Sequence, residues 1–327
     1  MGLAIKHHPG RHCASTALCN LANYQGLRWS EATCFGLGAG LGFWFINFPG
    51  ASPSRFIHVR SADLEEQFFQ RIGFSDAARK FSNPEEGERE LCRILDRGFP
   101  VLVQTDIYYL PYFNSKTHFP GHVITAWGYD SREKCFYVSD TEREGLQEVP
   151  FAAMRKARYS SHGFFSSKGN MFAPRNIAYP SDLPAIIGRA ILDNSRTLVN
   201  ISDSTAGVVS LEQWLHELPD WGKFDDWQWT ARFTYQVIEK RGTGGGGFRL
   251  LYKRFLEEAS SYLPRVSDLK LPEMMADLAA AWTALSEALQ KVSEEPVFNH
   301  EQIAPQLKQV QELELAYHSN ALKLDLG

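Results

Sequence analysis

The pattern of apolar residues changes near the middle of this chain of 327 residues, and that change limits the folds open to it. Before residue 160, segments with helical spacing alternate with β-branched runs, whereas after residue 182 most apolar segments have helical spacing. Ser, Gly, Asn and Pro gather in residues 160–182, as in a loop between domains. We therefore predict an α+β domain at residues 1–165 and a mainly helical domain at residues 166–327.

Cap residues and apolar spacing define the helices that we predict, and β-branched runs define the strands. The predicted helices are residues 13–24, 29–37, 61–72, 83–98 and 182–194, with two long apolar stripes at 278–292 and 303–317. The predicted strands are residues 54–59, 99–108 and, in the second domain, 230–240. We expect the last two helices to pack as a hairpin against each other or against the first domain.

Two apolar runs in the first domain predict an antiparallel β-hairpin. HVITAWGYD (122–130) and CFYVSD (135–140) are separated by the polar residues SREK. If the loop has five residues, beginning at Asp130, Tyr129 pairs with Cys135.

This register fixes which side chains share a face of the hairpin. His122 lies opposite Glu142, and Asp140 is then its diagonal neighbour on the same face, within side-chain reach. A loop one residue longer or shorter would put His122 and Asp140 on opposite faces.

The composition excludes several classes of protein. Lys and Arg total 34 against 38 Asp and Glu, a net charge of −4, which argues against nucleic acid as a partner. Five cysteines without C-x-x-C spacing argue against a disulfide framework or a zinc knuckle and fit a reducing compartment. No apolar run approaches the ~18 residues of a membrane span, and the start lacks a secretory apolar core. We expect a soluble, cytoplasmic protein.

Cys13 is the sharpest chemical feature of the sequence. A thiol at the N-terminus of a helix has its thiolate stabilised by the helix dipole and by unpaired backbone N–H groups, which suits a nucleophile. The alternative is a buried small hydrophobic residue, the common fate of a free cysteine. We assign the other four cysteines to the core: Cys19, Cys34, Cys92 and Cys135.

A thiolate nucleophile needs an imidazole to move protons, and the imidazole needs a carboxylate or amide to fix its tautomer. His122 and Asp140 meet these needs in the predicted register. Taken without Cys13, they are more simply a strand-rim histidine and a turn-forming aspartate. Together, the order of Cys, His at a strand start and Asp at the end of the next strand is that of papain-like cysteine enzymes.

Three segments resemble the butirosin biosynthesis protein H family: HCASTALCNLANYQGLRWSEATCFGLGAGLGFWF (12–45), GHVITAWGYD (121–130) and RGTGGGGFRLLYKRFLEEA (241–259). The resemblance implies a papain-like cysteine domain followed by a domain of uncharacterised type. It also implies an acyltransferase of antibiotic biosynthesis, which forms an amide by moving an acyl group from a carrier-protein thioester to an amine. Cys13 would be the nucleophile, His122 the base and Asp140 the orienting acid.

The same resemblance implies which partners and cofactors to expect. The donor would be an acyl carrier protein or another acyl thioester, and the acceptor a small amine. Phosphopantetheine would enter only as part of the carrier-protein substrate, and we expect no other cofactor. We expect no metal, because the spacing of His7, His8 and His12 matches no zinc site and no carboxylate is near them in sequence.

The sequence before Cys13 departs from the papain-like pattern. Such enzymes usually carry a glutamine a few residues earlier as an oxyanion donor, whereas this chain has KHHPGR (6–11). His7 or His8 is a candidate substitute, together with the backbone N–H of Cys13. Alternatively, the two histidines are simply solvated in an N-terminal arm.

Further candidates for substrate binding lie in the second half. The run of glycines at 242–247, including Gly244, precedes Arg249 in a predicted helix and would suit one phosphate, although a plain flexible turn is the simpler account. Trp214, Trp227 and Trp229 lie among acidic residues and would suit a cationic amine, or else they pack in a core.

Glu31 most simply favours a helix N-terminus, and the family resemblance adds an active-site role as a candidate.

The sequence thus favours a cysteine acyltransferase with a helical second domain that shapes the acceptor site. The first alternative is a cysteine peptidase or amidase, which uses the same three residues with water as the acceptor. The second is a non-catalytic module that binds a carrier protein.

Overall fold

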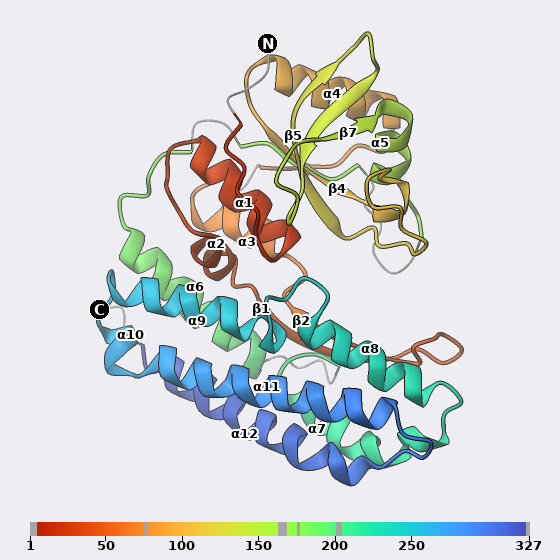
Figure 1. Cartoon of the computed structure of the whole chain (residues 1–327). Helices are drawn as coiled ribbons and strands as arrows, with labels where there is room; N and C mark the ends of the chain where they lie inside the picture. Colours follow the sequence, from red (N-terminus) through yellow and green to blue (C-terminus); the bar gives the residue numbers. More distant parts are fainter. Residues whose placement is uncertain (1–4, 75–76, 163–168, 175–176, 201–204, 325–327) are drawn as a thin grey trace. The chain divides into compact units, whose positions relative to one another are not determined.

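The computed structural model describes residues 5–74, 77–162, 169–174, 177–200 and 205–324. The chain forms two compact units, and each is built from two stretches of sequence (Figure 1). The N-terminal unit combines Met1–Cys34 with Glu65–Ser181, and the C-terminal unit combines Phe35–Leu64 with Asp182–Gly327. This differs from the contiguous division predicted near residue 165, because residues 35–64 join the C-terminal half.

An antiparallel sheet of six strands is the framework of the N-terminal unit, in the order β3-β8-β4-β5-β6-β7. The strands are β3 (Ala78–Arg79), β8 (Met171–Phe172), β4 (Val101–Thr105), β5 (His122–Asp130), β6 (Cys135–Ser139) and β7 (Gln147–Pro150). Helices α4 (Pro84–Asp96) and α5 (Phe151–Arg158) contribute to one apolar core with β4, β5 and β6. The mixture of helices and antiparallel strands is the predicted α+β class.

Helix α1 (Cys13–Tyr24) packs against β4 and β5, where Tyr24 contacts the edge of Trp127 with ring centroids 5.7 Å apart. The predicted helix at residues 13–24 is therefore present with the same bounds. Two further helices, α2 (Glu31–Leu37) and α3 (Leu64–Arg71), follow it, and the Ser30 hydroxyl caps α2 by accepting from Thr33 N–H at 2.9 Å.

The β5–β6 hairpin has the predicted register near its open end but not next to its loop. Asp130 pairs with Cys135, so the loop has four residues and the predicted five-residue loop is wrong. Asp130 shortens the loop because its carboxylate accepts two backbone N–H groups from within it. A β-bulge between Ala126 and Gly128 then restores the predicted pairing, with Thr125 opposite Ser139.

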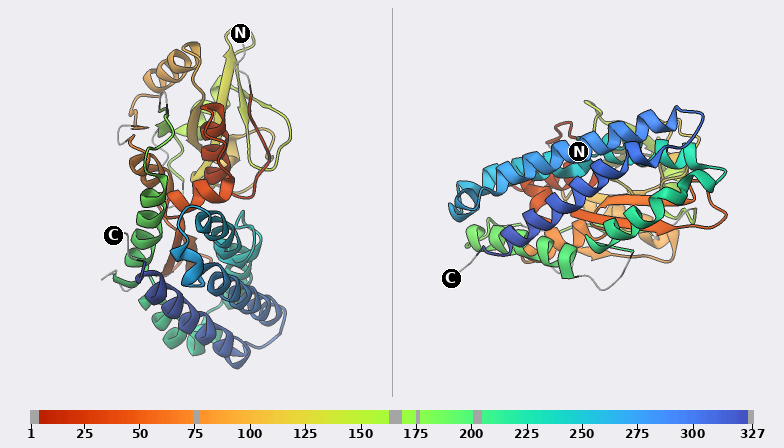
Figure 2. Two further views of the ribbon diagram at one scale, coloured as in Figure 1. Left: turned by 90° about the vertical axis from the view of Figure 1, so that its left-hand side faces the viewer. Right: turned by 90° about the horizontal axis from the view of Figure 1, so that it is seen from below.

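The C-terminal unit packs helices around a two-stranded sheet, β1 (Leu41–Asn47) and β2 (Arg55–Arg60). Its helices are α6 (Leu183–Asn200), α7 (Val209–Glu217), α8 (Trp227–Glu239), α9 (Arg249–Ser260), α10 (Arg265–Asp268), α11 (Leu271–Ser293) and α12 (Ala304–Ala321). Helices α11 and α12 pack side by side, as expected of the last two stripes (Figure 2). Phe43 and Phe45 of β1 stack on Trp214 of α7, so the β1–β2 hairpin buries its aromatic face within this unit.

Residues 230–240 form most of helix α8, and the predicted strand there is wrong. The segment contains β-branched and aromatic residues, which favour strands. Its buried residues are Thr230, Ala231, Thr234, Val237 and Ile238, which is the spacing of one helical face. Packing of that face against α11 decides the conformation.

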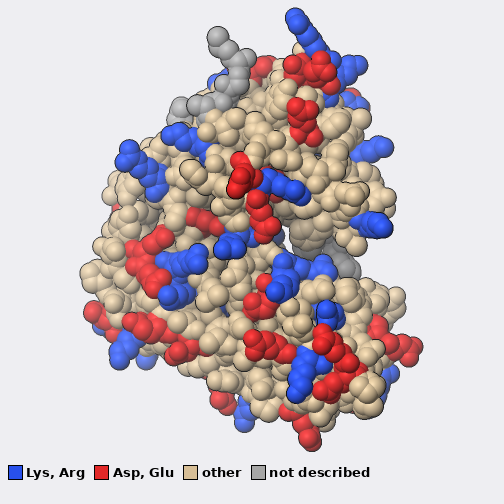
Figure 3. All heavy atoms as spheres, viewed as in Figure 1, with Lys and Arg blue, Asp and Glu red and all other residues tan. Residues whose placement is uncertain are grey.

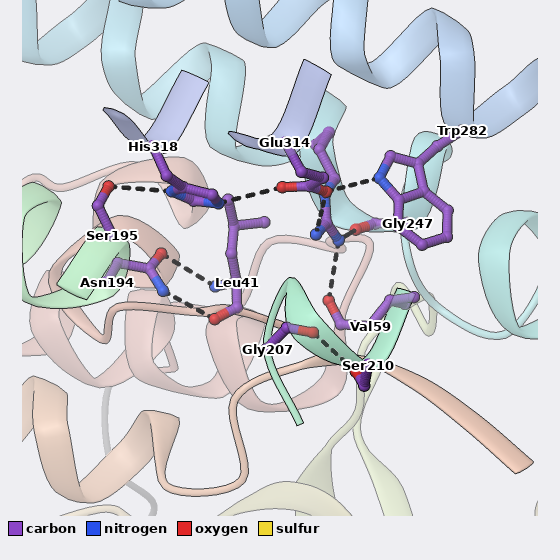
Figure 4. A network of polar contacts seen from close by, with 11 residues as sticks. Leu41, Val59, Asn194, Ser195, Gly207, Ser210, Gly247, Trp282, Glu314 and His318 are labelled. Atoms are coloured by element: carbon purple, nitrogen blue, oxygen red, sulfur yellow. Dashed lines mark hydrogen bonds and ion pairs between the residues drawn. The ribbon is translucent and has the colours of Figure 1, made fainter. Parts of the chain in front are cut away.

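A buried polar network crosses the C-terminal unit (Figure 4). Glu314 of α12 accepts from Arg249 Nε at 2.9 Å and from Trp282 Nε1 at 2.7 Å. Its other oxygen lies 3.0 Å from His318 Nε2, and His318 Nδ1 lies 3.0 Å from Ser195 Oγ. The network thus links α6, α9, α11 and α12. Apolar spacing does not predict it, because most of its partners lie far apart in the chain.

We predict that Glu314→Gln lowers the free energy of unfolding at pH 7 by about 3–5 kcal/mol, because the buried guanidinium of Arg249 loses its counter-charge. Burial raises the pKa of Glu314, but Arg249, His318 and Trp282 lower it to about 2. The stabilisation is therefore complete above the unfolded pKa of about 4.3 and is lost as the pH falls through about 2.

Urea denaturation of both proteins at pH 7 and pH 3 measures this difference. The control is Glu312→Gln on the same helix, where the side chain is exposed and its ion pair with Lys308 spans 4.0 Å. Equal destabilisation by the two substitutions would contradict the assignment of a buried ion pair to Glu314.

Candidate active site

Cys13 is the first residue of α1, and the chain leading into it is fixed by one carboxylate. Glu31 accepts hydrogen bonds from the backbone N–H groups of Arg11 (3.0 Å) and His12 (2.8 Å). It also accepts from the hydroxyls of Ser15 (2.9 Å) and Thr16 (3.2 Å). We predicted Glu31 as a candidate substrate contact. Its carboxylate instead binds backbone and hydroxyl groups of the protein and so positions the start of α1.

Gly10 shows how closely this turn is packed. A Cβ at this position would lie 2.0 Å from Thr16 Oγ1 and 2.8 Å from a carboxylate oxygen of Glu31. The backbone N–H of Gly10 donates to the carbonyl of Thr141 at 2.9 Å. The arm before Cys13 is therefore attached to the segment that follows β6.

His122 and Asp140 are brought together on one face of the sheet by the restored register. Nε2 of His122 lies 2.9 Å from both carboxylate oxygens of Asp140, and both side chains are buried. Tyr112 donates its hydroxyl to Asp140 at 2.7 Å, and Thr141 donates its own at 3.0 Å. The ring of Phe113 packs edge-on against the imidazole, with centroids 5.1 Å apart.

A loop between β4 and β5 supplies Tyr112 and Phe113, and Asp106 holds that loop in shape. Its buried carboxylate accepts from the backbone N–H groups of Tyr108 (3.1 Å) and Phe119 (2.9 Å). The Ser160 hydroxyl also donates to it, at 2.6 Å, and His118 Nδ1 lies 2.7 Å from it. These contacts fix both ends of the loop that packs on His122.

The imidazole of His122 connects the carboxylate to the thiol. Since Nε2 faces Asp140, Nδ1 is the ring nitrogen left for the hydrogen bond with Cys13. Burial lowers the pKa of His122, but the charge and hydrogen bond of Asp140, together with Cys13, raise it to about 10. Burial raises the pKa of Asp140, but His122, Tyr112 and Thr141 hold it below its ordinary value.

Two neighbouring imidazoles lower the pKa of the Cys13 thiol. Burial raises the pKa of Cys13, but the charges of His12 and His122 and the hydrogen bonds of both rings bring it well below its ordinary value. These two directions favour a thiolate at Cys13 beside an imidazolium at His122. The arrangement has the parts needed for nucleophilic attack at Sγ with proton transfer through His122.

His7 and His8 are placed differently from the expected oxyanion donors. His7 Nε2 lies 2.5 Å from the carbonyl oxygen of Arg143, and Nδ1 lies 2.8 Å from Asn20 Nδ2, so both ring nitrogens are engaged. His8 is exposed, and its backbone N–H donates to Asn20 at 3.1 Å. The histidine beside the thiol is His12, for which we predicted no catalytic role, although its position directly before Cys13 is a signal that points to one.

The candidates in the second half belong to the C-terminal unit. Contrary to the expected phosphate contact, Arg249 is fully buried and paired with Glu314. Gly244 lies in the turn between α8 and α9 at φ 71°, and the nearby Gly246 N–H donates to Glu239 at 2.9 Å. A carboxylate of the chain itself thus takes the position that we assigned to a phosphate.

The three tryptophan candidates differ in exposure. Trp214 is fully buried in an aromatic stack, so it serves the core rather than a substrate. Trp227 is half-buried against Phe298, and Trp229 is 39% exposed. Only the last two therefore offer surface to a ligand among these three residues.

Three features of the described residues concern metal binding, membrane spans and surface charge. Within the described residues, no group of three or more His, Cys, Asp or Glu side chains is arranged to hold a metal ion. No helix in the described part of the chain is long and apolar enough to cross a membrane. On the face drawn in Figure 3, cationic and anionic side chains intermingle.

Comparison with known families covers most of the chain. Residues 12–141 match the family model described as "Butirosin biosynthesis protein H, N-terminal", and residues 152–321 match "Domain of unknown function (DUF4872)". No curated protein matches the chain at a significant level. The two models follow each other in the order that the sequence resemblance implied.

We predict that Cys13 is the most reactive thiol at neutral pH, because its pKa lies well below the ordinary value. Cys92 is the internal control, since burial and then the charges of Glu88 and Asp96 raise its pKa to about 11. Limited alkylation with iodoacetamide, followed by peptide mapping, compares the two sites. Preferential labelling of Cys92 would contradict the assignment of Cys13 as nucleophile.

We also predict that Asp140→Asn lowers the pKa of His122, since the charge that raises it is removed. The imidazolium is then lost at a lower pH, and the basic limb of the pH profile of Cys13 alkylation moves down by about 1–3 units. The half-buried Asp130→Asn, at the far end of β5, is the control, since asparagine keeps a side-chain oxygen to accept from the loop. A basic limb that stays in place in Asp140→Asn would refute the coupling of Asp140 to His122.

Proposed function

Because this chain belongs to the butirosin biosynthesis protein H family, we propose that it is a cysteine acyltransferase of antibiotic biosynthesis that forms an amide. The observation that carries the proposal is the convergence of Cys13, His122 and Asp140 at the N-terminus of α1. The first half of the proposal, biosynthesis, follows the printed name of the family. The second half, acyl transfer to an amine, is what the family resemblance implies, and the three residues supply the acyl-enzyme chemistry that it requires.

The first half-reaction transfers the acyl group to the enzyme. The thiolate of Cys13 attacks the carbonyl carbon of the donor thioester, and the tetrahedral intermediate collapses by breaking the bond to the donor sulfur. Imidazolium His122 gives its proton to the departing thiolate, which leaves as a thiol. Cys13 then carries the acyl group as a thioester, and His122 is neutral.

The second half-reaction transfers the acyl group to the amine. The amine nitrogen attacks the thioester carbonyl, neutral His122 accepts a proton from that nitrogen, and the Cys13 thiolate leaves. The products are an amide and the resting thiolate–imidazolium pair. Asp140 stays ionised throughout and stabilises the imidazolium whenever it forms, as the carboxylate of a catalytic triad does.

Chemistry at Cys13 suits a thioester donor. A thioester exchanges for another thioester in the first step, which is nearly balanced in energy, and conversion of the thioester to an amide then drives the second step. No metal or redox group takes part in either step. The phosphopantetheine thiol of an acyl carrier protein is the donor that the family resemblance implies, and a small amine is the acceptor.

The same residues would serve a hydrolase if water replaced the amine. A peptidase or amidase therefore remains the second candidate, since its acylation step is identical and only deacylation differs. A non-catalytic module that binds a carrier protein is a third, but the lowered pKa of Cys13 and its pairing with His122 have no role in such a module.

Intact-protein mass spectrometry with a simple acyl thioester, such as an N-acetylcysteamine thioester, tests the proposal. We predict that the full chain gains the mass of one acyl group, that Cys13→Ala gains none, and that the control Cys92→Ala behaves as the wild type does. An added amine should then discharge the acyl-enzyme to an amide faster than water hydrolyses it.

Two results would decide against the transferase. Absence of any adduct at Cys13 would reject an acyl-enzyme altogether. Formation of free acid alone, at saturating concentrations of a panel of amines, would favour the hydrolase.

A further inference from the structure

We propose that His12 is a second catalytic imidazole, which donates a hydrogen bond from Nε2–H to Sγ of Cys13. The inference rests on the proposed function for its role in turnover, but the contact itself is a property of the resting protein. His12 directly precedes the nucleophile, whereas His7 binds the carbonyl of Arg143 and the side chain of Asn20.

The position of His12 in the backbone directs its ring toward the start of α1. His12 is the N-cap of the helix, with extended backbone angles of φ −122° and ψ 136°. Its ring is buried, and Nδ1 accepts a hydrogen bond from the backbone N–H of Ser15 at 3.3 Å. A histidine whose Nδ1 accepts carries its proton on Nε2 when it is neutral, so Nε2–H is the donor that remains.

Glu31 fixes both parts of this arrangement. Its carboxylate accepts from the backbone N–H of His12 at 2.8 Å and from the hydroxyl of Ser15 at 2.9 Å. Because the Ser15 hydroxyl donates to Glu31, it is not a donor to His12 Nδ1, and the backbone N–H of Ser15 is the donor that Nδ1 accepts. The ring and the thiol are thus held on adjacent residues of one rigid turn.

Among the described residues, two imidazoles act on the thiol of Cys13, and each has a carboxylate behind it. His12 lies at the N-terminus of α1 and His122 on β5. Asp140 binds His122 on its far side, and Glu31 binds the backbone of His12. Both imidazoles, through charge and hydrogen bonding, lower the pKa of Cys13. The thiol therefore has two donors from different elements.

A second hydrogen-bond donor to Sγ would act in both half-reactions of the transfer. His122 loses its proton in the first half-reaction, so it is neutral while the acyl-enzyme waits for the amine. His12 Nε2–H needs no proton transfer and keeps its hydrogen whatever the state of His122. It can therefore stabilise the sulfur each time negative charge builds on it, first as nucleophile and later as leaving group.

The substitution His12→Asn separates the two roles of this residue. Asparagine is among the best N-cap residues, so it keeps the acceptor for Ser15 N–H while removing the imidazole donor. We expect His12→Asn to keep the melting temperature of the wild type and to react with iodoacetamide about tenfold more slowly below the thiol pKa. His12→Ala, which removes the cap as well, should lose both reactivity and thermal stability.

The decisive measurement is the alkylation rate of Cys13 as a function of pH in the full chain. A higher thiol pKa in His12→Asn, with the melting temperature unchanged, supports the proposal. An unchanged profile in a folded His12→Asn overturns it and leaves His12 as a cap only. If this variant does not fold, the imidazole ¹⁵N shifts of His12 in the wild type decide: a proton on Nε2 supports the donor, and a proton on Nδ1 overturns it.

This test is independent of the acyl-transfer assay, because iodoacetamide requires no acyl donor or amine. A shifted thiol pKa in His12→Asn together with an unreactive thioester would uphold the role of His12 and reject the transferase. Normal acyl transfer by His12→Asn with an unchanged alkylation profile would do the reverse.

Discussion

The candidate site depends on one irregularity in the sheet, the β-bulge between Ala126 and Gly128. A hairpin that continued the register set by its four-residue loop would turn His122 and Asp140 to opposite faces. The extra residue at the bulge, Trp127, returns the two side chains to one face, and its indole N–H donates to Ser139 at 2.8 Å. The same indole contacts Tyr24 of α1, so the residue that corrects the register also supports the helix that carries the thiol.

In each unit, one glutamate accepts several hydrogen bonds: Glu31 in the N-terminal unit and Glu314 in the C-terminal unit. The two sites differ in how far solvent reaches the neighbouring groups. Glu31 collects backbone and hydroxyl donors at the start of α1 and leaves the thiol beside it half-buried. Glu314 collects Arg249, Trp282 and His318 in the interior of the C-terminal unit. Ser195, His318 and Glu314 are connected in the order of a serine triad, but all three are at most 2% exposed, so no substrate reaches them. Solvent access, rather than connectivity, distinguishes the reactive group from the structural one.

The electrostatic design favours a thiol that is ionised before a substrate arrives. The pKa of Cys13 falls below its ordinary value although burial raises it, because the charges and hydrogen bonds of His12 and His122 lower it. Asp140 keeps one of them protonated, and Tyr112 and Thr141 in turn hold Asp140 in place. Such a group attacks thioesters readily and leaves readily, which are the two demands that a ping-pong transfer makes of its nucleophile.

The local pattern of residues by itself determined helix α1 with its thiol at the first position, the strands of the hairpin, the α+β class and the family. These features depend on neighbours in sequence, through helix dipoles, caps and β-branched side chains. It did not determine the bulge, the conformation of residues 230–240, the membership of residues 35–64 in the C-terminal unit or the burial of Arg249 against Glu314. Only the tertiary structure decided those, because each depends on contacts with residues distant in sequence, whose packing outweighs local preference.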